Sequence, residues 1–395
     1  MALLAPYWSG AREPRPGAVR VVGLLSSTVG LGQGARLCAQ SLRRMGCEVT
    51  GVDVARWLAW HRHFAPEPDA VAEMPQPAAE QAGAVIVHLN PPEFPVALAL
   101  LGRRGLRHAY LIGYWAWELD TIPPAWRRVA RRVDEIWVPS HFVAQAFARG
   151  GVAGAHVVPH PVPAPAALEA GRAQFALPDD VFVCLCVFDA RSSLARKNPG
   201  AALRAFAAAF GSRRDVLLLM KASGIDSDSG GCAALRAEVQ RAPNMRWMDD
   251  TLPPARQQAL FGLVDVVISL HRSEGFGLVC AEAMRAGVPV LATAWSGNMD
   301  FMTADNSALV DCRLVPVRDP RGIYACPGAR WAEPDIDLAA ERLRALAADR
   351  GAARALGARG RRDAELYFGQ PRFERQVGAR LAPWSPRHDM QVHDG

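Results

Sequence analysis

Along the whole chain, short apolar, β-branched runs alternate with helical segments, and this alternation constrains the fold more than any other feature of the sequence. Val264–Leu270 and Val288–Thr293 are two such runs, and the segment between them carries helix formers and ends at Gly287. Continuous apolar runs are typical of strands buried on both faces, and strands that alternate with helices form parallel sheets. The sequence therefore predicts an α/β protein built from doubly wound parallel sheets.

A proline-rich break at His160–Pro165 separates two sets of these strands and helices. A chain of 395 residues has room for two or three domains, because domains commonly hold about 100–200 residues. We expect two domains with a short hinge between them and a last helix that crosses back before a loose tail. The predicted boundaries are 1–165, hinge 166–180, 181–366, and 367–395 for the crossing helix and tail.

Composition narrows the class of protein. Half of the residues are hydrophobic and the net charge is only +6, which suits a globular protein with an anionic ligand or membrane surface and predicts no nucleic-acid partner. The eight cysteines include no C-x-x-C pair and several lie in apolar runs, so we expect buried thiols in a reducing compartment and no zinc site. Neither a signal peptide nor a membrane span is predicted, which favours the cytoplasm.

The stretch after the Val264–Leu270 strand carries the strongest pattern for a ligand site. Gly275 and Gly277 lack a Cβ and let a ligand approach the backbone, and the helix that follows points its N–H groups there, which suits a phosphate. Glu274 lies in the loop and Glu282 on the helix, with seven residues between them. Because ligands of open α/β sheets bind at the carboxyl ends of strands, the two carboxylates can hold hydroxyls of one long ligand. For an isolated pair, a helix-dipole carboxylate and a solvated residue are the simpler interpretation.

A second glycine-rich turn follows the first predicted strand. Gly30, Gly32 and Ala35 satisfy G-x-G-x-x-A, and Asp53 ends the next strand where a ribose-binding acid belongs. This fingerprint favours an NAD-dependent oxidoreductase, although a tight turn explains so short a motif equally simply. Both interpretations stay open at this point.

The stretch SLHRSEGFGLVCAEAMRAGVPVLATAWSGNMDFM, from Ser269 to Met302, closely resembles the retaining glycosyltransferases of family 4. The similarity covers nearly the whole chain and is strongest over Phe182–Met302. It implies the GT-B fold, with two Rossmann-like domains facing across a cleft and the donor bound mainly by the C-terminal one. It also implies transfer of a sugar from a UDP- or GDP-sugar to an acceptor hydroxyl with retention of configuration, without a metal or other cofactor.

The resemblance assigns roles to the donor side. Glu274 would contact hydroxyls of the transferred sugar and support positive charge on its ring. Lys197 would neutralise the donor pyrophosphate, assisted by Arg196 or Ser192, since the leaving diphosphate gains negative charge. Glu274 and Lys197 are the expected catalytic groups. For Lys197, the alternative interpretation is that Arg196 and Lys197 form a surface pair at the start of a helix.

Further donor contacts are implied by the same match. Glu282 would hold the ribose hydroxyls, and the backbone N–H groups of Phe276, Gly277 and Leu278 would face the phosphates. Gly32, in the N-terminal domain, is similar to the glycine that approaches the pyrophosphate.

The acceptor side departs from the family pattern. Many members place a histidine after the fourth strand of the first domain, whereas this chain has Tyr114 and Trp115 there, and His88 is not a clean match. We therefore expect no named general base, because front-face displacement lets the leaving phosphate take the acceptor proton. Acceptor-side candidates are His88, Trp115, Glu118 and Asn298; core packing is the alternative for Trp115, and a turn for Asn298.

The predicted activity is transfer to a glycan or lipid-linked acceptor in surface polysaccharide or glycolipid synthesis. The predicted helix with Arg127, Arg128, Arg131 and Arg132 leaves open a peripheral position at the inner face of the membrane, although a solvated basic face is the simpler interpretation. The oxidoreductase and a catalytically silent carbohydrate-binding relative are the competing predictions.

Overall fold

The computed structural model of the protein describes residues 18–27, 29–58, 83–106, 109–165, 171–225, 231–250 and 252–381. The expectations for the N-terminal segment, for Thr28, for the first residues of the hinge and for the C-terminal tail fall outside these residues. The chain divides into two compact units, which are treated separately here. Unit 1 comprises 1–117, 122–161 and 370–395; unit 2 comprises 118–121 and 162–369.

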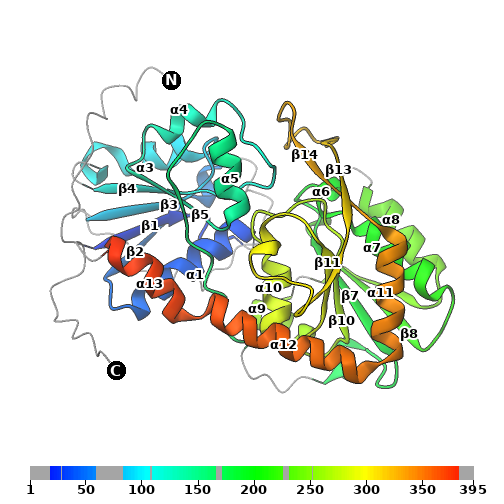
Figure 1. The fold of residues 1–395 in the computed structure, drawn as a ribbon. Helices are drawn as coiled ribbons and strands as arrows, with labels where there is room; N and C mark the ends of the chain where they lie inside the picture. Colours follow the sequence, from blue (N-terminus) through cyan, green and yellow to red (C-terminus); the bar gives the residue numbers. More distant parts are fainter. Residues whose placement is uncertain are drawn as a thin grey trace. The chain divides into compact units, whose positions relative to one another are not determined.

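Unit 1 is built on a six-stranded sheet in the order β2-β1-β3-β4-β5-β6, in which every paired strand is parallel (Figure 1). The chain runs outward from β1 in both directions, so the switch in strand order lies between β1 and β3. The strands are β1 (Val19–Gly23), β2 (Val49–Asp53), β3 (Ala84–His88), β4 (Tyr110–Tyr114), β5 (Glu135–Val138) and β6 (Ala155–Val157).

Helices cover this sheet and share its core. The core joins strand residues such as Val21 and Ile86 to Leu42 of the first helix and Phe373 of the last. The last helix, expected to cross back from the C-terminal half, therefore packs into unit 1. The elements are α1 (Gly30–Arg44), η2 (Ala55–Trp57), α3 (Phe94–Leu106), α4 (Trp126–Ala130), α5 (His141–Arg149) and α13 (Gln370–Leu381).

Unit 2 has its own six-stranded parallel sheet, in the order β12-β11-β10-β7-β8-β9. The first strand of the set, β7, pairs with β8 on one side and with β10 on the other, so the switch in order lies between β7 and β10. The strands are β7 (Phe182–Asp189), β8 (Val216–Ser223), β9 (Met245–Met248), β10 (Val266–Ser269), β11 (Val290–Thr293) and β12 (Ala308–Val310).

Alternate residues of β7 enter two different cores, because successive side chains of a strand point to opposite faces. Cys184 packs with α7 and α11, while Leu185 packs with α9, α10 and α12. Both units are thus doubly wound α/β layers, which confirms the predicted fold class. The elements are η4 (Arg172–Phe175), α6 (Leu194–Lys197), α7 (Pro199–Phe210), α8 (Gly231–Arg241), α9 (Pro254–Phe261), α10 (Leu278–Arg285), η6 (Gly297–Asp300), α11 (Ile336–Ala348) and α12 (Arg350–Phe368).

The sequence prediction was wrong about the segment after β12. The apolar run at 308–315 predicts a single strand, but this strand ends at Val310, and β13 (Cys312–Pro316) pairs antiparallel with β14 (Arg330–Pro334) in a separate hairpin. The sequence from 331 to 363 predicts one helical segment, but the helix starts at Ile336, because the Asp335 carboxylate caps it by accepting from Leu338 N at 3.0 Å. A break at Asp349 then separates α11 from α12.

Within the described ranges, no helix has both the length and the apolar character needed to cross a bilayer.

Candidate active site

The switch point of the unit 2 sheet organises the candidate site. Lys197 ends the short helix α6, which follows β7, and Glu274 lies in the loop that follows β10. Because β7 and β10 are neighbours whose connections leave in opposite directions, their carboxyl ends form the crevice where open α/β sheets bind ligands. Topology therefore brings together two residues that stand far apart in the sequence.

The turn after β7 is fixed by its own polar residues. Ser193 caps α6 by accepting from Arg196 N at 3.3 Å, and Asn198 ends the helix in the left-handed region with φ 51°. Asparagine tolerates this conformation because its side chain forms local hydrogen bonds, and Asn198 Nδ2 donates to Leu270 O at 3.0 Å. The turn thus ties α6 to the end of β10 and places Arg196 and Lys197 beside the Glu274 loop.

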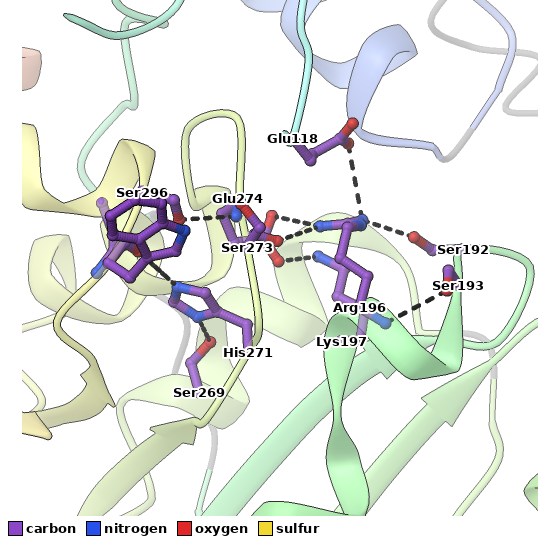
Figure 2. A network of polar contacts seen from close by, with 12 residues as sticks. Glu118, Ser192, Ser193, Arg196, Lys197, Ser269, His271, Ser273, Glu274 and Ser296 are labelled. Atoms are coloured by element: carbon purple, nitrogen blue, oxygen red, sulfur yellow. Dashed lines mark hydrogen bonds and ion pairs between the residues drawn. The ribbon is translucent and has the colours of Figure 1, made fainter. Parts of the chain in front are cut away.

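Glu274 is held by two cations (Figure 2). Lys197 Nζ donates to Glu274 Oε1 at 2.6 Å, and Arg196 Nη1 lies 3.1 Å from Glu274 Oε2. The residue is only 9% exposed. Burial alone would raise the pKa of Glu274, but Lys197 and Arg196 outweigh it and lower that pKa to about 2. The carboxylate is therefore ionised at neutral pH.

Arg196 is the centre of the network. Its guanidinium is buried and donates to Ser273 O at 2.9 Å and to Ser192 Oγ at 2.6 Å. Glu118 Oε1 lies 3.7 Å from Arg196 Nη2, and the Tyr324 ring centroid lies 5.6 Å from Arg196 Cζ. Burial raises the pKa of Glu118, and Arg196 opposes that effect. Two carboxylates thus balance two cations in this cluster.

A second polar network, centred on His271, holds the loop that carries Glu274 against the loop that carries Asn298. His271 Nδ1 lies 2.9 Å from Ser269 Oγ, and His271 Nε2 lies 3.1 Å from Asn298 Oδ1. Two acceptors on the Nε2 side, Asn298 Oδ1 and Trp295 O, favour the tautomer with a proton on Nε2. Burial lowers the pKa of His271, so the ring is neutral. His271 lies within the stretch that resembles family 4, but no role was predicted for it; its place shortly after β10 was the available signal.

The Asn298 loop supports Glu274 through the backbone. Glu274 N donates to Ser296 Oγ at 2.8 Å, and Gly297 N donates back to Glu274 O at 2.9 Å. Ser296 adopts φ 82°, a region that costs a residue with a Cβ about 1–3 kcal/mol. A Cβ on Gly297 would overlap Gly275 O, so the close packing of the two loops requires glycine there. Asn298 is fully buried in this support.

The β13–β14 hairpin braces the turn after β7. Asp319 accepts from Ser193 Oγ at 2.9 Å, and Arg321 Nη1 donates to Arg191 O at 2.8 Å. At the base of the hairpin, Arg272 Nη2 lies 2.7 Å from Glu333 Oε2. The segment Glu118–Thr121 joins the same arrangement, because Arg330 N donates to Asp120 Oδ1 at 3.0 Å. The hairpin, which was not predicted from the sequence, therefore helps to fix the turn that carries Arg196 and Lys197.

A small cavity of about 20 Å³ lies between the carboxyl ends of β7 and β10. Lys197, Glu274 and Gly277 line it, together with Val187 and Cys280. A volume of this size holds about one water molecule. Helix α10 begins beside it at Gly277, which has φ 97° and forms no side-chain cap, so the helix start lies next to the Lys197–Glu274 pair.

The other donor-side candidates divide between the two units. Phe276 is buried against Phe301 and Phe368, while Leu278 and Glu282 are half-buried on α10. Gly32 lies in α1 of unit 1, where a Cβ would overlap Leu24 O and Ser27 O. The close packing of α1 on the turn after β1 is enough to require glycine there.

The acceptor-side candidates do not form one cluster. Trp115 is buried and stacks on Phe147 with centroids 5.7 Å apart, as core packing predicts. His88 is buried and stacks on Tyr114 at 4.3 Å, and burial holds its pKa well below the usual value. Glu118 belongs to unit 2 and faces Arg196, so the structure places it with the donor-side residues.

Two chemical features of the site region bear on cofactors. In the described part of the chain, no group of three or more His, Cys, Asp or Glu side chains is arranged to hold a metal ion. All eight cysteines have free thiols. Asp53, the ribose-binding candidate of the dinucleotide fingerprint, instead accepts from Ser26 Oγ at 2.6 Å and shapes the turn after β1.

The fold and the site define the class of this protein. The sequence matches the model of the family described as "Family 4 Glycosyltransferase in conflict systems" over residues 151–365, which is more than half of the chain. The chain therefore belongs to that family and is a glycosyltransferase. This membership sets aside the oxidoreductase interpretation of the Gly30–Ala35 turn.

Solved structures share its GT-B fold. HepE from Anabaena in complex with UDP-glucose has a TM-score of 0.65 and 16% identity, over 93% of this chain and 99% of that one. Sucrose-phosphate synthase from Thermosynechococcus elongatus has a TM-score of 0.63 and 16% identity, over 93% and 98%. TarM from S. aureus has a TM-score of 0.56 and 12% identity over 75% of this chain. The chain covers 54% of TarM, which is about half of its length. No curated protein matches the sequence.

Proposed function

We propose that the protein is a retaining glycosyltransferase that moves a sugar from a UDP- or GDP-sugar to an acceptor hydroxyl. The observation that carries the proposal is the Lys197–Glu274–Arg196 cluster at the switch point of the unit 2 sheet. Two cations and one ionised carboxylate meet there beside the start of α10, which matches the charges of a diphosphate and of a sugar ring that gains positive charge.

The nature of the donor is supported by the relatives of this fold. HepE was solved with UDP-glucose and TarM with UDP. A helix start is a favourable place for phosphates, and α10 begins at Gly277 beside Lys197. The donor is the only small molecule in the proposed reaction; neither a metal nor another cofactor has a part in it.

In the proposed reaction, Lys197 and Arg196 stabilise the negative charge that develops on the leaving diphosphate. Glu274 faces the sugar and stabilises the positive charge on its ring, which requires the carboxylate to be ionised. Its pKa of about 2 meets this requirement. Ser192 orients Arg196 through the 2.6 Å hydrogen bond, while Glu282 and the N–H groups at the start of α10 bind the ribose and the phosphates.

Retention follows if the acceptor attacks from the face that the diphosphate leaves. The glycosidic C–O bond breaks, the acceptor C–O bond forms, and a phosphate oxygen takes the acceptor proton. This route needs no general base. His271 is unsuited to that role because it is buried and hydrogen-bonded to Ser269 and Asn298.

The acceptor is a glycan or a lipid-linked saccharide, and the reaction takes place in the cytoplasm. The exposed arginines Arg127, Arg128 and Arg131 near α4 support a peripheral position at an anionic membrane, because such side chains bind acidic headgroups. A role in surface polysaccharide or glycolipid synthesis rests on the sequence resemblance.

The test is a screen of sugar nucleotides with the purified full chain, in which released nucleoside diphosphate and glycosylated product are measured by mass spectrometry. One UDP- or GDP-sugar should be turned over, and Glu274→Gln should reduce turnover sharply without loss of the fold. A chain that binds sugars, yet releases no diphosphate from any donor with any glycan acceptor, would be a catalytically silent relative. Inversion at the anomeric carbon, read by NMR of the product, would refute the retaining mechanism.

A further inference from the structure

The chain contains 45 basic residues of the Lys and Arg types, yet only two of them are lysines, Lys197 and Lys221. Both lie in unit 2, one after β7 and the other within the neighbouring strand β8. Arg and Lys differ in chemistry, since the ammonium is a compact point charge and the guanidinium a wide planar fork. A chain that uses arginine almost everywhere therefore has one of its two ammonium groups just after β7 and the other on the adjacent strand β8.

Lys221 is a buried cation. It is 3% exposed, and among the described residues its ammonium has no hydrogen-bond or ion-pair partner. The nearby Asp189 is already engaged, because Arg191 Nη2 donates to Asp189 Oδ2 at 2.8 Å. An ammonium that no described protein group engages, on a side chain otherwise buried, is available to a ligand, and Asp189 and Asp250 are the carboxylates that act on it. Burial also lowers the pKa of Lys221.

The strand register places Lys221 next to the site. Val187 of β7 and Met248 of β9 are its partners in the parallel ladder. Partners in register point to the same face of a sheet, and Val187 lines the small cavity together with Lys197 and Glu274. Val187 and Met248 both pack against the core on the α9 and α10 face. Lys221 therefore lies on that face, one strand farther from β10 than β7, the strand that precedes Lys197.

We infer that Lys221 donates a hydrogen bond to a carbonyl oxygen of the donor's nucleobase. This inference rests on the proposed function, which sets the direction of the donor. With the diphosphate at Lys197 after β7 and the ribose at Glu282 on α10, the nucleoside lies on the α9 and α10 face of the sheet, which is also the face of Lys221. Lys197, Arg196 and the start of α10 already serve the phosphates, and the acceptors left for Lys221 are those of the base.

The consequence is a preference among bases. Uracil, thymine and guanine carry carbonyl oxygens, whereas adenine has none and presents an amino group instead. An ammonium placed to meet a base carbonyl would face the amino group of adenine, which is also a donor, and such a mismatch disfavours adenine. Lys221 thus selects keto bases and rejects adenine.

The lysine count makes a direct test practical. Full-length protein labelled with ¹³Cε-lysine has only two side chains to observe by NMR, and Lys221→Arg identifies which signal is which. We expect the Lys221 signal to move with UDP, GDP and millimolar uridine, and to stay in place with inorganic pyrophosphate or ADP. A Lys221 signal that moves with pyrophosphate but not with uridine would overturn the inference, because the lysine would then bind phosphate.

Affinity measurements give a second readout. Lys221→Met keeps the length of the side chain and removes the ammonium, and we expect the Kd for UDP to rise about tenfold or more, as for loss of a charged hydrogen bond. The Kd for ADP should fall, because the ammonium that disfavours adenine is gone. Lys197→Met is the matched control and should weaken both nucleotides. Equal loss of UDP and ADP in Lys221→Met would contradict base selection.

The two failures can be told apart. If the Lys197 signal responds to UDP while the Lys221 signal does not, the sugar-nucleotide site stands and the base contact is wrong. If neither signal responds to any nucleotide or sugar nucleotide, the proposed function itself fails.

Discussion

Lys197 Nζ donates to Glu274 Oε1 at 2.6 Å, so the residue proposed to hold the diphosphate and the residue proposed to face the sugar hold each other. The pair spans β7 and β10, the two strands between which the sheet order switches. Arg196 approaches the other carboxylate oxygen at 3.1 Å, which fixes the plane of the Glu274 carboxylate. The proposed donor site therefore presents a carboxylate and two cations whose positions are already set.

Replacing Glu274 with Gln should reduce turnover sharply. The amide keeps the shape and an acceptor oxygen but loses the charge that supports the sugar ring, and we expect kcat to fall by about 10²–10³-fold. Affinity for UDP should stay within about threefold, because the phosphate ligands remain. Steady-state kinetics and calorimetry measure the two effects. A variant that keeps most of its kcat would exclude an electrostatic role for this carboxylate.

The same carboxylate makes stability depend on pH. The folded-state pKa of Glu274 is lowered from 4.5 to about 2, so its ionisation stabilises the fold above pH 4.5, and this contribution is lost as the pH falls toward 2. The shift corresponds to roughly 3 kcal/mol. In urea unfolding, the free energy of the wild type should fall more steeply between pH 5 and pH 3 than that of Glu274→Gln. Parallel curves for the two proteins would contradict the shift.

Replacing Gly297 with Ala tests the contact between the two loops. The added Cβ would overlap Gly275 O, so the Glu274 loop must move. We expect a loss of about 1–3 kcal/mol in the free energy of unfolding and a lower kcat, as for overpacking in a tight site. The matched control is Gly171→Ala, because a Cβ there meets nothing within 4 Å. If both variants melt like the wild type, the loop adapts and the close packing has no energetic role.

The C-terminal helix of unit 1 depends on one arginine. Arg380 of α13 donates to Glu135 Oε1 and lies 2.6 Å from His156 Nδ1, and the Glu135 side chain is only 8% exposed. Removing Arg380 leaves a buried carboxylate without its cation, so Arg380→Ala should cost about 2 kcal/mol in unfolding free energy. Hydrogen exchange over 370–381 should rise.

Arg375 provides the control for that helix, because it is exposed on the same element. Arg375→Ala should change neither the unfolding free energy nor the exchange of α13. Similar losses in both arginine variants would mean that helix propensity, and not the Glu135 pair, holds α13 in place.

The strands and helices were largely predictable, because apolar runs such as those of β7 and β10 are continuous and are followed by polar segments. The proximity of Lys197 and Glu274 follows from sheet topology and was predictable through the family resemblance; their roles stay predictions. The β13–β14 hairpin was missed because Arg330–Pro334 is short and has no repeating apolar pattern. No local signal distinguishes such a strand from the start of the helix that follows.

Side-chain surroundings were harder to predict than elements. Glu118 follows a unit 1 strand and was placed on the acceptor side, yet its carboxylate faces Arg196, far away in sequence. Trp115 was as consistent with sugar stacking as with core packing until its contact with Phe147 was known. The hydrogen bond from Glu274 N to Ser296 Oγ depends on the positive φ of Ser296. A positive φ cannot be predicted from the sequence at a serine.

The short insertion Glu118–Thr121 has a practical consequence for dissecting the enzyme. A fragment started at Val162 to isolate unit 2 would leave behind the fully buried Leu119 and the Asp120 carboxylate that accepts from Arg330 N. Such a fragment should expose the apolar surface that Leu119 covers, so a separately folded unit 2 has to carry residues 118–121 as a fused segment.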